Sequence, residues 1–475
     1  MSKLECPTEL TFRPFFMEVF MEKKNKMETM HMQKLVINMS LPLIVSLLVQ
    51  SLYNIVDSIF VAKMSEEALT ATSLAFPVQM LMIAFSVGTS VGVNALLSKT
   101  LGARNRERAT KIANTGIMLA LINGAVFSLT GIFFAQKLAR SFTTVESTAA
   151  LCAEYLSICM VFCFGNFIET MLQRFLQAAG NTVLSMCSLI AGAVTNIMLD
   201  PILIFGLLGF PALGIRGAAI ATVIGQWLGA AVALLLNRFC NREVIVDFRR
   251  FCPEKEIIFG IYKVGLPNII TQAISSVMVT LVNQILMPLS MSAVAFFGVY
   301  YKLQNFLFMP MNGLGQAAIP IVGFNLGAKN PDRIRDCMKK VFPMALGIAV
   351  AGTALFQMIP GQLLSLFSPS EEMLEIGIPA LRIISWSFVL GAATIISGYC
   401  ASGLGYGITT MISTTLRQIL VLIPCIWLFS RYGGLGNAWY AMWVAEACGV
   451  AFALTSLLRQ LRKKVRTLEK TAALR

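Results

Sequence analysis

One stretch of the sequence, from about Asn181 to Gly206, constrains the chain more than any other. It is apolar for about the thickness of a bilayer, yet it carries Asn196 and Asp200 four positions apart, with Pro201 directly after them. A spacing of four places the amide and the carboxylate on one face of a helix. Proline cannot donate a backbone hydrogen bond, so the carbonyl of Ile197 loses its helical partner. Because a carboxylate in hydrocarbon is costly, this acid is a functional candidate that faces a cavity rather than lipid.

The composition sets the class of protein. Of the 475 residues, 56% are hydrophobic and only 13% are charged, which predicts an all-α polytopic membrane protein. The net charge of +14 does not indicate nucleic acid, because the Lys and Arg residues lie between apolar segments, where they set orientation. The single histidine, His31, precedes the first apolar segment, so histidine-based catalysis and histidine metal sites inside the membrane are excluded. We therefore expect no cofactor and no enzymatic activity.

Windows of about 20 apolar residues predict twelve membrane spans. They lie near 35–62, 68–97, 112–135, 150–178, 181–206, 214–237, 258–287, 293–322, 336–359, 374–402, 408–429 and 434–458. The predicted organisation is an N-terminal segment (1–34), an N-lobe of six spans (35–237), a linker (238–257), a C-lobe of six spans (258–458) and a basic tail (459–475).

The basic residues predict which side of the membrane each loop occupies. They cluster before the first span, after the second, sixth and eighth spans, and in the tail, all on one side of the membrane. The positive-inside rule makes that side cytoplasmic, so both termini are predicted to be cytoplasmic in a multi-pass protein of the plasma (inner) membrane.

An internal repeat relates the two lobes. Leu101-Gly102-Ala103-Arg104-Asn105 follows the second span, and Leu326-Gly327-Ala328-Lys329-Asn330 follows the eighth, at an offset of 225 residues. The same offset relates Leu41-Pro42 to Leu266-Pro267, and Gly88 to Gly313. Parallel repeats of this kind are related by an axis along the membrane normal, with the binding site near the midplane.

The topology brings three polar residues of the N-lobe to a similar depth. Asp57 lies in the outer third of the first span, Asp200 near the outer end of the fifth, and Thr222 near the outer mouth of the sixth. Further candidates for a cavity are Gln50, Tyr53 and Asn54 on the face of Asp57, together with Gln272 and Met309 in the C-lobe.

Other interpretations of these residues stay open. Asp57 and Asp200 could be a structural pair that shares a proton or that bonds neighbouring hydroxyls and amides. Asn196 and Thr222 could join helices through hydrogen bonds, as such residues often do in membranes.

The C-lobe has no counterparts of the two acids. Val282 stands at the position of Asp57, and the neighbourhood of Leu422 and Ile423 at that of Asp200. Charged residues occur elsewhere at mid-depth and are expected to form a structural network: Lys302, Arg417 and Glu446. In the fourth span, Glu169 and Arg174 are expected to make a gate or interface pair.

Taken together, these features resemble the MATE family of multidrug and toxic compound extrusion transporters. The resemblance rests on the twelve spans in two parallel lobes, the paired Leu-Gly-Ala-Arg/Lys-Asn turns, the segment Tyr53 to Asp57, the run Asn196 to Phe205 and the run Gly217 to Thr222. It covers residues 34–460.

The resemblance implies an antiporter of the bacterial drug-efflux branch. In that branch, the cation or proton site of the N-lobe corresponds here to Asp57, Asn196, Asp200 and Thr222. Another branch has acidic ligands in the seventh and tenth spans. This chain departs from that pattern, with Gln272 in the seventh span and no acid around Ser397 to Ser402 in the tenth, so a C-lobe ion site is not expected.

The predicted function is export of amphipathic, often cationic, small molecules in exchange for H+ or Na+ by a monomer embedded in the lipid bilayer. The only metal expected is Na+ as the coupling ion, and no nucleic acid partner is expected. The alternative within the same superfamily is a flippase or exporter of a lipid-linked or other endogenous metabolite. A purely structural or receptor role would require no acids in the membrane.

Overall fold

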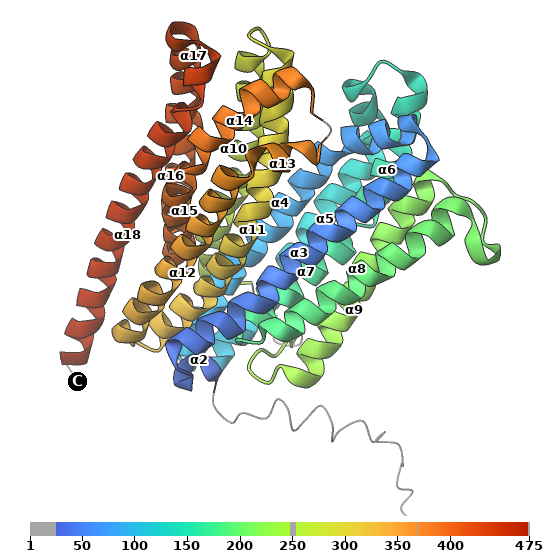
Figure 1. Cartoon of the computed structure of the whole chain (residues 1–475). Helices are drawn as coiled ribbons and strands as arrows, with labels where there is room; N and C mark the ends of the chain where they lie inside the picture. Colours follow the sequence, from blue (N-terminus) through green and yellow to red (C-terminus); the bar gives the residue numbers. More distant parts are fainter. Residues whose placement is uncertain (1–24, 248–252, 368, 474–475) are drawn as a thin grey trace, which may run out of the picture.

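The computed structural model describes residues 25–247, 253–367 and 369–473, and in these residues the chain forms helices and no strand. Figure 1 shows long helices arranged in two groups. The blue-to-green helices of the first half of the chain lie mainly on one side, and the orange-to-red helices of the second half lie on the other. The all-α, two-lobe architecture predicted from the sequence is confirmed.

The N-lobe follows a short helix, α2 (Lys26–Thr29). Its helices are α3 (Met32–Met64), α4 (Glu66–Gly102), α5 (Arg106–Phe142), α6 (Glu146–Val161), α7 (Phe164–Ala178), α8 (Thr182–Phe205), the 3-10 turn η1 (Leu207–Gly209) and α9 (Ile215–Cys240).

The C-lobe contains the remaining helices. They are α10 (Lys255–Leu286), α11 (Met291–Gly327), α12 (Pro331–Met358), α13 (Pro360–Ser365), α14 (Glu371–Ser385), α15 (Ser387–Gly403), α16 (Gly407–Thr415), the π-helix η3 (Leu416–Leu422), α17 (Ile423–Ala438) and α18 (Ala441–Ala473). Helix α18 extends well beyond 458, so most of the predicted basic tail is helical.

Ten helices or continuous helical runs in the described ranges are long and apolar enough to cross a membrane. Two further spans are bent pairs of helices, α6 with α7 at 46° and α14 with α15 at 51°. Counting each pair as one crossing gives twelve, as the hydropathy windows predicted. The first residues of the two pairs, Glu146 and Glu371, are 225 positions apart, so the bend belongs to the repeat.

The repeated turns have the same local structure. Each begins with the C-terminus of a helix and contains a residue in the left-handed region, Arg104 with φ 57° and Lys329 with φ 56°. The next residue is an asparagine that caps the following helix. Asn105 accepts a hydrogen bond from the backbone N–H of Arg108 at 2.9 Å, and Asn330 accepts one from that of Arg333 at 3.2 Å.

The two lobes meet through reciprocal contacts. A Cβ placed on Gly102 would lie 1.9 Å from the carbonyl oxygen of Phe324, and one placed on Gly327 would lie 1.8 Å from that of Lys99. Because Phe324 and Gly327 are offset by 225 from Lys99 and Gly102, the two contacts are equivalent. They are the contacts expected of a pseudo-twofold axis between the lobes.

A second reciprocal pair lies deeper in the interface. Gly88 packs against Ile269, and Gly313 packs against Ile44, again at an offset of 225. Each glycine leaves no room for a Cβ, which would come within 2.3 Å and 2.6 Å of the isoleucine side chains. Small residues let membrane helices approach this closely.

All these contacts lie toward the end of the molecule that carries α2 and the C-terminus (Figure 1). They involve the second halves of α4 and α11 and the first halves of α3 and α10. We name this the closed end. In the opposite half of α4, Phe76 lines the space between the lobes and is 53% exposed.

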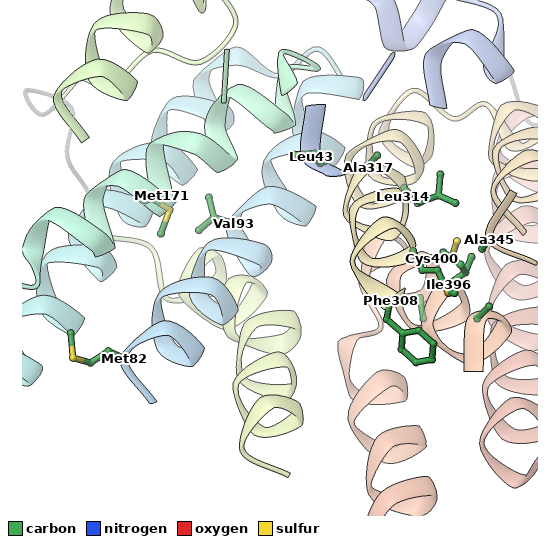
Figure 2. Packing of buried hydrophobic residues seen from close by; sticks show 14 of the residues in the cluster. Leu43, Met82, Val93, Met171, Phe308, Leu314, Ala317, Ala345, Ile396 and Cys400 are labelled. Atoms are coloured by element: carbon green, nitrogen blue, oxygen red, sulfur yellow. The ribbon is translucent and has the colours of Figure 1, made fainter. Parts of the chain in front are cut away.

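Apolar side chains fill both lobes. Figure 2 shows Val93 and Met171 packed within the N-lobe, with Phe308, Ile396 and Cys400 gathered within the C-lobe. The ring of Phe388 contacts Phe308 edge-to-face at 5.6 Å between centroids. Packing of this kind keeps each lobe a unit.

Candidate functional site

The proposed acidic site begins on α8. Asn196 and Asp200 lie one helical turn apart, as their spacing predicted, and are 3% and 0% exposed. The amide of Asn196 donates a hydrogen bond to Asp200 Oδ1 at 3.3 Å. Pro201 lies inside the helix, which ends at Gly206 in the left-handed conformation with φ 74°.

Helix α9 contributes the third residue. The amide of Asn196 also donates to Thr222 Oγ1 at 3.4 Å. The close approach of α8 and α9 depends on Gly192 and Gly225, because a Cβ on either would lie 2.8 Å from the carbonyl oxygen of the other. One asparagine therefore links the acid to the neighbouring helix.

Helix α3 brings the second acid to the same place. The carboxyl groups of Asp57 and Asp200 lie within hydrogen-bonding reach of each other. Two carboxylates only accept, so a bond between them requires a proton on one of them. The structure thus brings together Asp57, Asn196, Asp200 and Thr222, which we name the acidic cluster.

Three oxygens of the acidic cluster are buried without a hydrogen-bond partner: Asp57 Oδ1, Asn196 Oδ1 and Asp200 Oδ2. Buried polar atoms are normally satisfied, and those that are not call for an explanation. Hard oxygen donors of this kind suit a proton or a sodium ion.

A cavity of about 760 Å³ lies between the lobes, beside the acidic cluster. Residues of both lobes line it, and the polar ones include Gln50, Tyr53, Glu169, Gln173, Arg174, Asn196, Thr222, Gln272, Gln316 and Arg417. Asn196 and Thr222 line the cavity, whereas Asp57 and Asp200 do not. The two acids therefore lie behind the cavity wall, and Asn196 connects them to it.

The other predicted cavity residues divide into two groups. Gln50, Tyr53, Gln272 and Met309 line the cavity. Asn54 does not line the cavity and is exposed on the surface of α3. The helical spacing placed Asn54 only roughly, because residues three apart differ by about 60° in direction around a helix.

Glu169 is a cavity residue whose role the sequence interpretation missed. It is the only acid that lines the cavity within the described residues. Its carboxylate accepts from the amide of Gln173 at 3.0 Å and lies against Gly229 of α9, where a Cβ would be 2.4 Å from Oε1. Its position inside a span was the available signal, since intramembrane acids are functional candidates by default.

The predicted pair of Glu169 and Arg174 is wrong. Arg174 Nη1 instead donates to Gln177 at 2.7 Å and to Gln316 of the C-lobe at 2.9 Å. The two side chains diverge because Glu169 and Arg174 are five residues apart on α7, which is about 500° of helical rotation. The expectation that Arg174 lies at an interface is correct, because its bond to Gln316 crosses between the lobes.

In the C-lobe, a buried ion pair occupies the interior. Arg417 on the π-helix pairs with Glu446 of α18, and their side chains are 16% and 8% exposed. Lys302 is exposed and forms no ion pair within the part of the chain that the structure describes. The prediction that Lys302 joins Arg417 and Glu446 in a network is therefore wrong. Val282 is fully buried among apolar residues, as expected.

No group of three or more His, Cys, Asp or Glu side chains in the described ranges could hold a metal ion. His31, the only histidine, precedes α3 as its N-cap residue. The acidic cluster has two carboxylates, one amide and one hydroxyl, which is a different donor set.

Comparison with known proteins identifies relatives over most of the chain. A family model described as MatE matches residues 42–202 and 267–428, and the two matches begin 225 residues apart. The multidrug export protein MepA of Staphylococcus aureus is 26% identical over 92% of this chain and 96% of its own length. The probable multidrug resistance protein YoeA of Bacillus subtilis is 29% identical over 88% of this chain and 90% of its own.

Solved structures share the arrangement as well. One is described as the outward-facing conformation of a multidrug resistance MATE family transporter of the MOP superfamily, with a TM-score of 0.85 and 26% identity over 94% of this chain and 99% of that one. Another, of a MOP superfamily transporter from Pyrococcus furiosus described as having a binding pocket of reverse polarity, has a TM-score of 0.85 and 25% identity over the same shares.

Proposed function

The chain belongs to the MatE family, and from this premise we propose that it exports amphipathic, often cationic, small molecules in exchange for H+ or Na+. The observation that carries the exchange is the double position of Asn196, which lines the cavity and donates a hydrogen bond to Asp200 behind it. A change of occupancy at the acidic cluster therefore reaches the cavity wall through a single side chain.

The cavity supplies the binding site for the exported compound. Its lining combines amides and hydroxyls with apolar side chains such as Met309, and flexible methionines accommodate ligands of different shape. Glu169 provides the negative charge that a cationic ligand needs, because its only described hydrogen-bond partner is the neutral amide of Gln173. A cation in the cavity would therefore gain an ion pair without breaking another.

The acidic cluster is proposed to bind the coupling ion. A proton on one carboxyl allows it to donate to the other, and a sodium ion would coordinate the unpartnered oxygens of Asp57, Asn196 and Asp200. The ion drives a conformational change only as far as its affinities for the two conformations differ. The membrane potential adds about 2.3 kcal/mol per charge per 100 mV.

The lobes are proposed to alternate between states open to opposite sides. The closed end carries the basic turns at Leu101–Asn105 and Leu326–Asn330, so the positive-inside rule assigns it to the cytoplasm. In our proposal the cavity opens away from the closed end, to the outside. We place the protein in the plasma membrane as a monomer, with both termini cytoplasmic and with transport rather than catalysis as its activity.

The decisive experiment uses the purified protein in sealed vesicles. Efflux of a fluorescent lipophilic cation is followed under an imposed pH gradient and, separately, under an imposed sodium gradient. Transport driven by either gradient and lost in Asp57→Asn and Asp200→Asn supports exchange at the acidic cluster. Transport retained in both variants would refute that assignment. If neither gradient drives dye movement, while a lipid-linked oligosaccharide is moved, the cargo is of the alternative class.

A further inference from the structure

A short segment crosses the closed end and bonds to both lobes. It runs from Asn25 to His31, includes α2, and precedes the first membrane span. We name it the strap. In Figure 1, α2 lies at the end of the molecule where the lobes meet.

The strap is attached to the N-lobe at its beginning and middle. The amide of Asn25 donates to Glu243 Oε2 at 2.8 Å and to the carbonyl of Ala179 at 3.4 Å. Glu28 forms an ion pair with Arg104 at 2.6 Å. These partners lie after α9, after α7 and in the repeated turn after α4, so the strap is bonded to three separate parts of the N-lobe at the closed end.

Hydrogen bonds from Arg333 attach the strap to the C-lobe. Arg333 Nη2 donates to the carbonyl oxygens of Met27 and Met30, each at 2.9 Å. Its Nε donates to Asn325 of α11 at 3.2 Å, which orients the guanidinium toward the strap. Hydrogen bonds from a charged donor are stronger than those between neutral groups.

The strap is packed as well as hydrogen-bonded. Met27 is 0% exposed and belongs to the hydrophobic core. Its Cγ lies 3.5 Å from where a Cβ of Gly180 would be, so it fits against the glycine of the turn between α7 and α8. Burial of a methionine is a favourable contribution that is lost when the strap leaves.

The repeat does not impose this arrangement. Arg108 is offset by 225 from Arg333, and both donate their backbone N–H to the asparagine cap of their own helix. Arg108 is exposed, and its guanidinium donates no hydrogen bond to another residue in the described part of the chain. The side-chain role of Arg333 is therefore specific to the C-lobe.

We propose that the strap is a latch on the cytoplasmic closure, held by Arg333 on one lobe and by Glu243, Ala179 and Arg104 on the other. The lobes cannot separate at this end while both sets of contacts persist, because the same short segment is bonded to both lobes. At least one set must release before the cavity can open to the cytoplasm. The strap thereby stabilises the state that is open to the outside. Its role rests on the proposed alternation of the lobes.

The test measures the separation of the lobes directly. Spin labels are placed at positions 107 and 332, using an encoded unnatural amino acid so that the native cysteines remain. Glu107 and Asp332 are pseudo-symmetry mates at the closed end, and their side chains are 78% and 86% exposed. Distances are recorded in nanodiscs without a gradient or substrate, so the result does not depend on the transport assay.

Two variants loosen the strap from opposite sides, each with a matched control. Arg333→Gln removes the C-lobe bonds and is compared with Arg108→Gln. Asn25→Ala removes the bonds to Glu243 and Ala179, leaving the ion pair of Glu28 with Arg104, and is compared with Thr29→Ala, an exposed residue of α2. We expect the long-distance population to rise at least threefold in both strap variants and to stay unchanged in both controls.

Two outcomes would overturn the latch. In one, Arg333→Gln and Asn25→Ala give the distance distributions of their controls. In the other, the long-distance population falls. Monodisperse elution of each variant shows that it is folded. Asn25→Ala keeps the test valid if Arg333→Gln fails to fold. A latch that is confirmed while dye efflux is absent would leave the conformational role intact and remove only the proposed cargo.

Discussion

Arg417 and Glu446 form a buried ion pair inside the C-lobe, whereas Asp57 and Asp200 inside the N-lobe form no ion pair within the described residues. The two lobes share a fold but differ in charge. In the C-lobe, the positive charge beside the buried acid is the guanidinium of Arg417, which is part of the chain and cannot exchange. In our proposal, the acidic cluster of the N-lobe instead receives an exchangeable cation at its unpartnered oxygens.

The ion pair should behave as a unit in stability measurements. We expect Arg417→Met to lower the free energy of unfolding by about 3–5 kcal/mol, because it leaves the carboxylate of Glu446 buried and unpaired. Arg417→Met combined with Glu446→Gln should cost clearly less than the sum of the single changes. Thermal or denaturant unfolding in detergent measures this, and additive effects would contradict a direct pair.

The acidic cluster should be required for coupling and not for folding. Asp57→Asn and Asp200→Asn should each reduce gradient-driven efflux at least tenfold while the protein remains in the membrane, because each removes the charge that binds the ion. Glu107→Gln is the matched control, since that side chain is 78% exposed at the closed end. Equal loss of transport in the control would point to a general defect instead.

Glu169 should determine the preference for cations. Glu169→Gln removes the only acid in the described lining of the cavity, so binding of a cationic dye should weaken about tenfold while binding of a neutral compound of similar size changes little. Fluorescence titration of both ligands checks this. Equal weakening for the two compounds would indicate a change of shape rather than of charge.

The glycine behind Glu169 offers an independent test of its position. In Gly229→Ala the new methyl group would lie 2.4 Å from Glu169 Oε1, so the carboxylate must move and cation binding should fall. Gly347→Ala is the matched control, because it also lies in a helix and nothing lies within 4 Å of its Cβ position. Cation affinity that is the same in both variants would show that the carboxylate is free to relocate.

The reciprocal glycines should be needed for closure. Gly102→Ala and Gly327→Ala each place a methyl group within 2 Å of a carbonyl oxygen of the other lobe, and a backbone cannot yield as a side chain can. We expect both variants to favour the cytoplasm-open state, with a larger separation between labels at positions 107 and 332. A separation equal to that of Gly347→Ala would mean that the contacts are not limiting.

The sequence predicted the parts of the structure that depend on depth and repetition. The 225-residue offset paired Gly88 with Gly313, and the structure gives these two glycines equivalent contacts, with Ile269 and Ile44. Hydropathy and sidedness likewise placed Asp57 at the depth of Asp200. These properties follow from the order of the chain alone.

The rotation of each helix about its own axis was harder to predict. Glu169 and Arg174 both lie on α7, five residues apart, so the regular rotation of that helix turns the two side chains away from each other. Asn54 was misplaced for a related reason, since it lies at the edge of the face that Asp57 defines. The strap contacts of Arg333 join residues about 300 positions apart, with no periodic signal to reveal them.

The reciprocal approach of main chain to main chain at Gly102 and Gly327 has a consequence for how such a pump can change under selection. A contact between peptide groups does not depend on which side chains surround it. Substitutions in the cavity can therefore change substrate preference without weakening the contact between the lobes. The same contact tolerates no added atom at either position. Variation that broadens the range of exported compounds should therefore accumulate toward the mouth, while these two positions stay fixed as glycine.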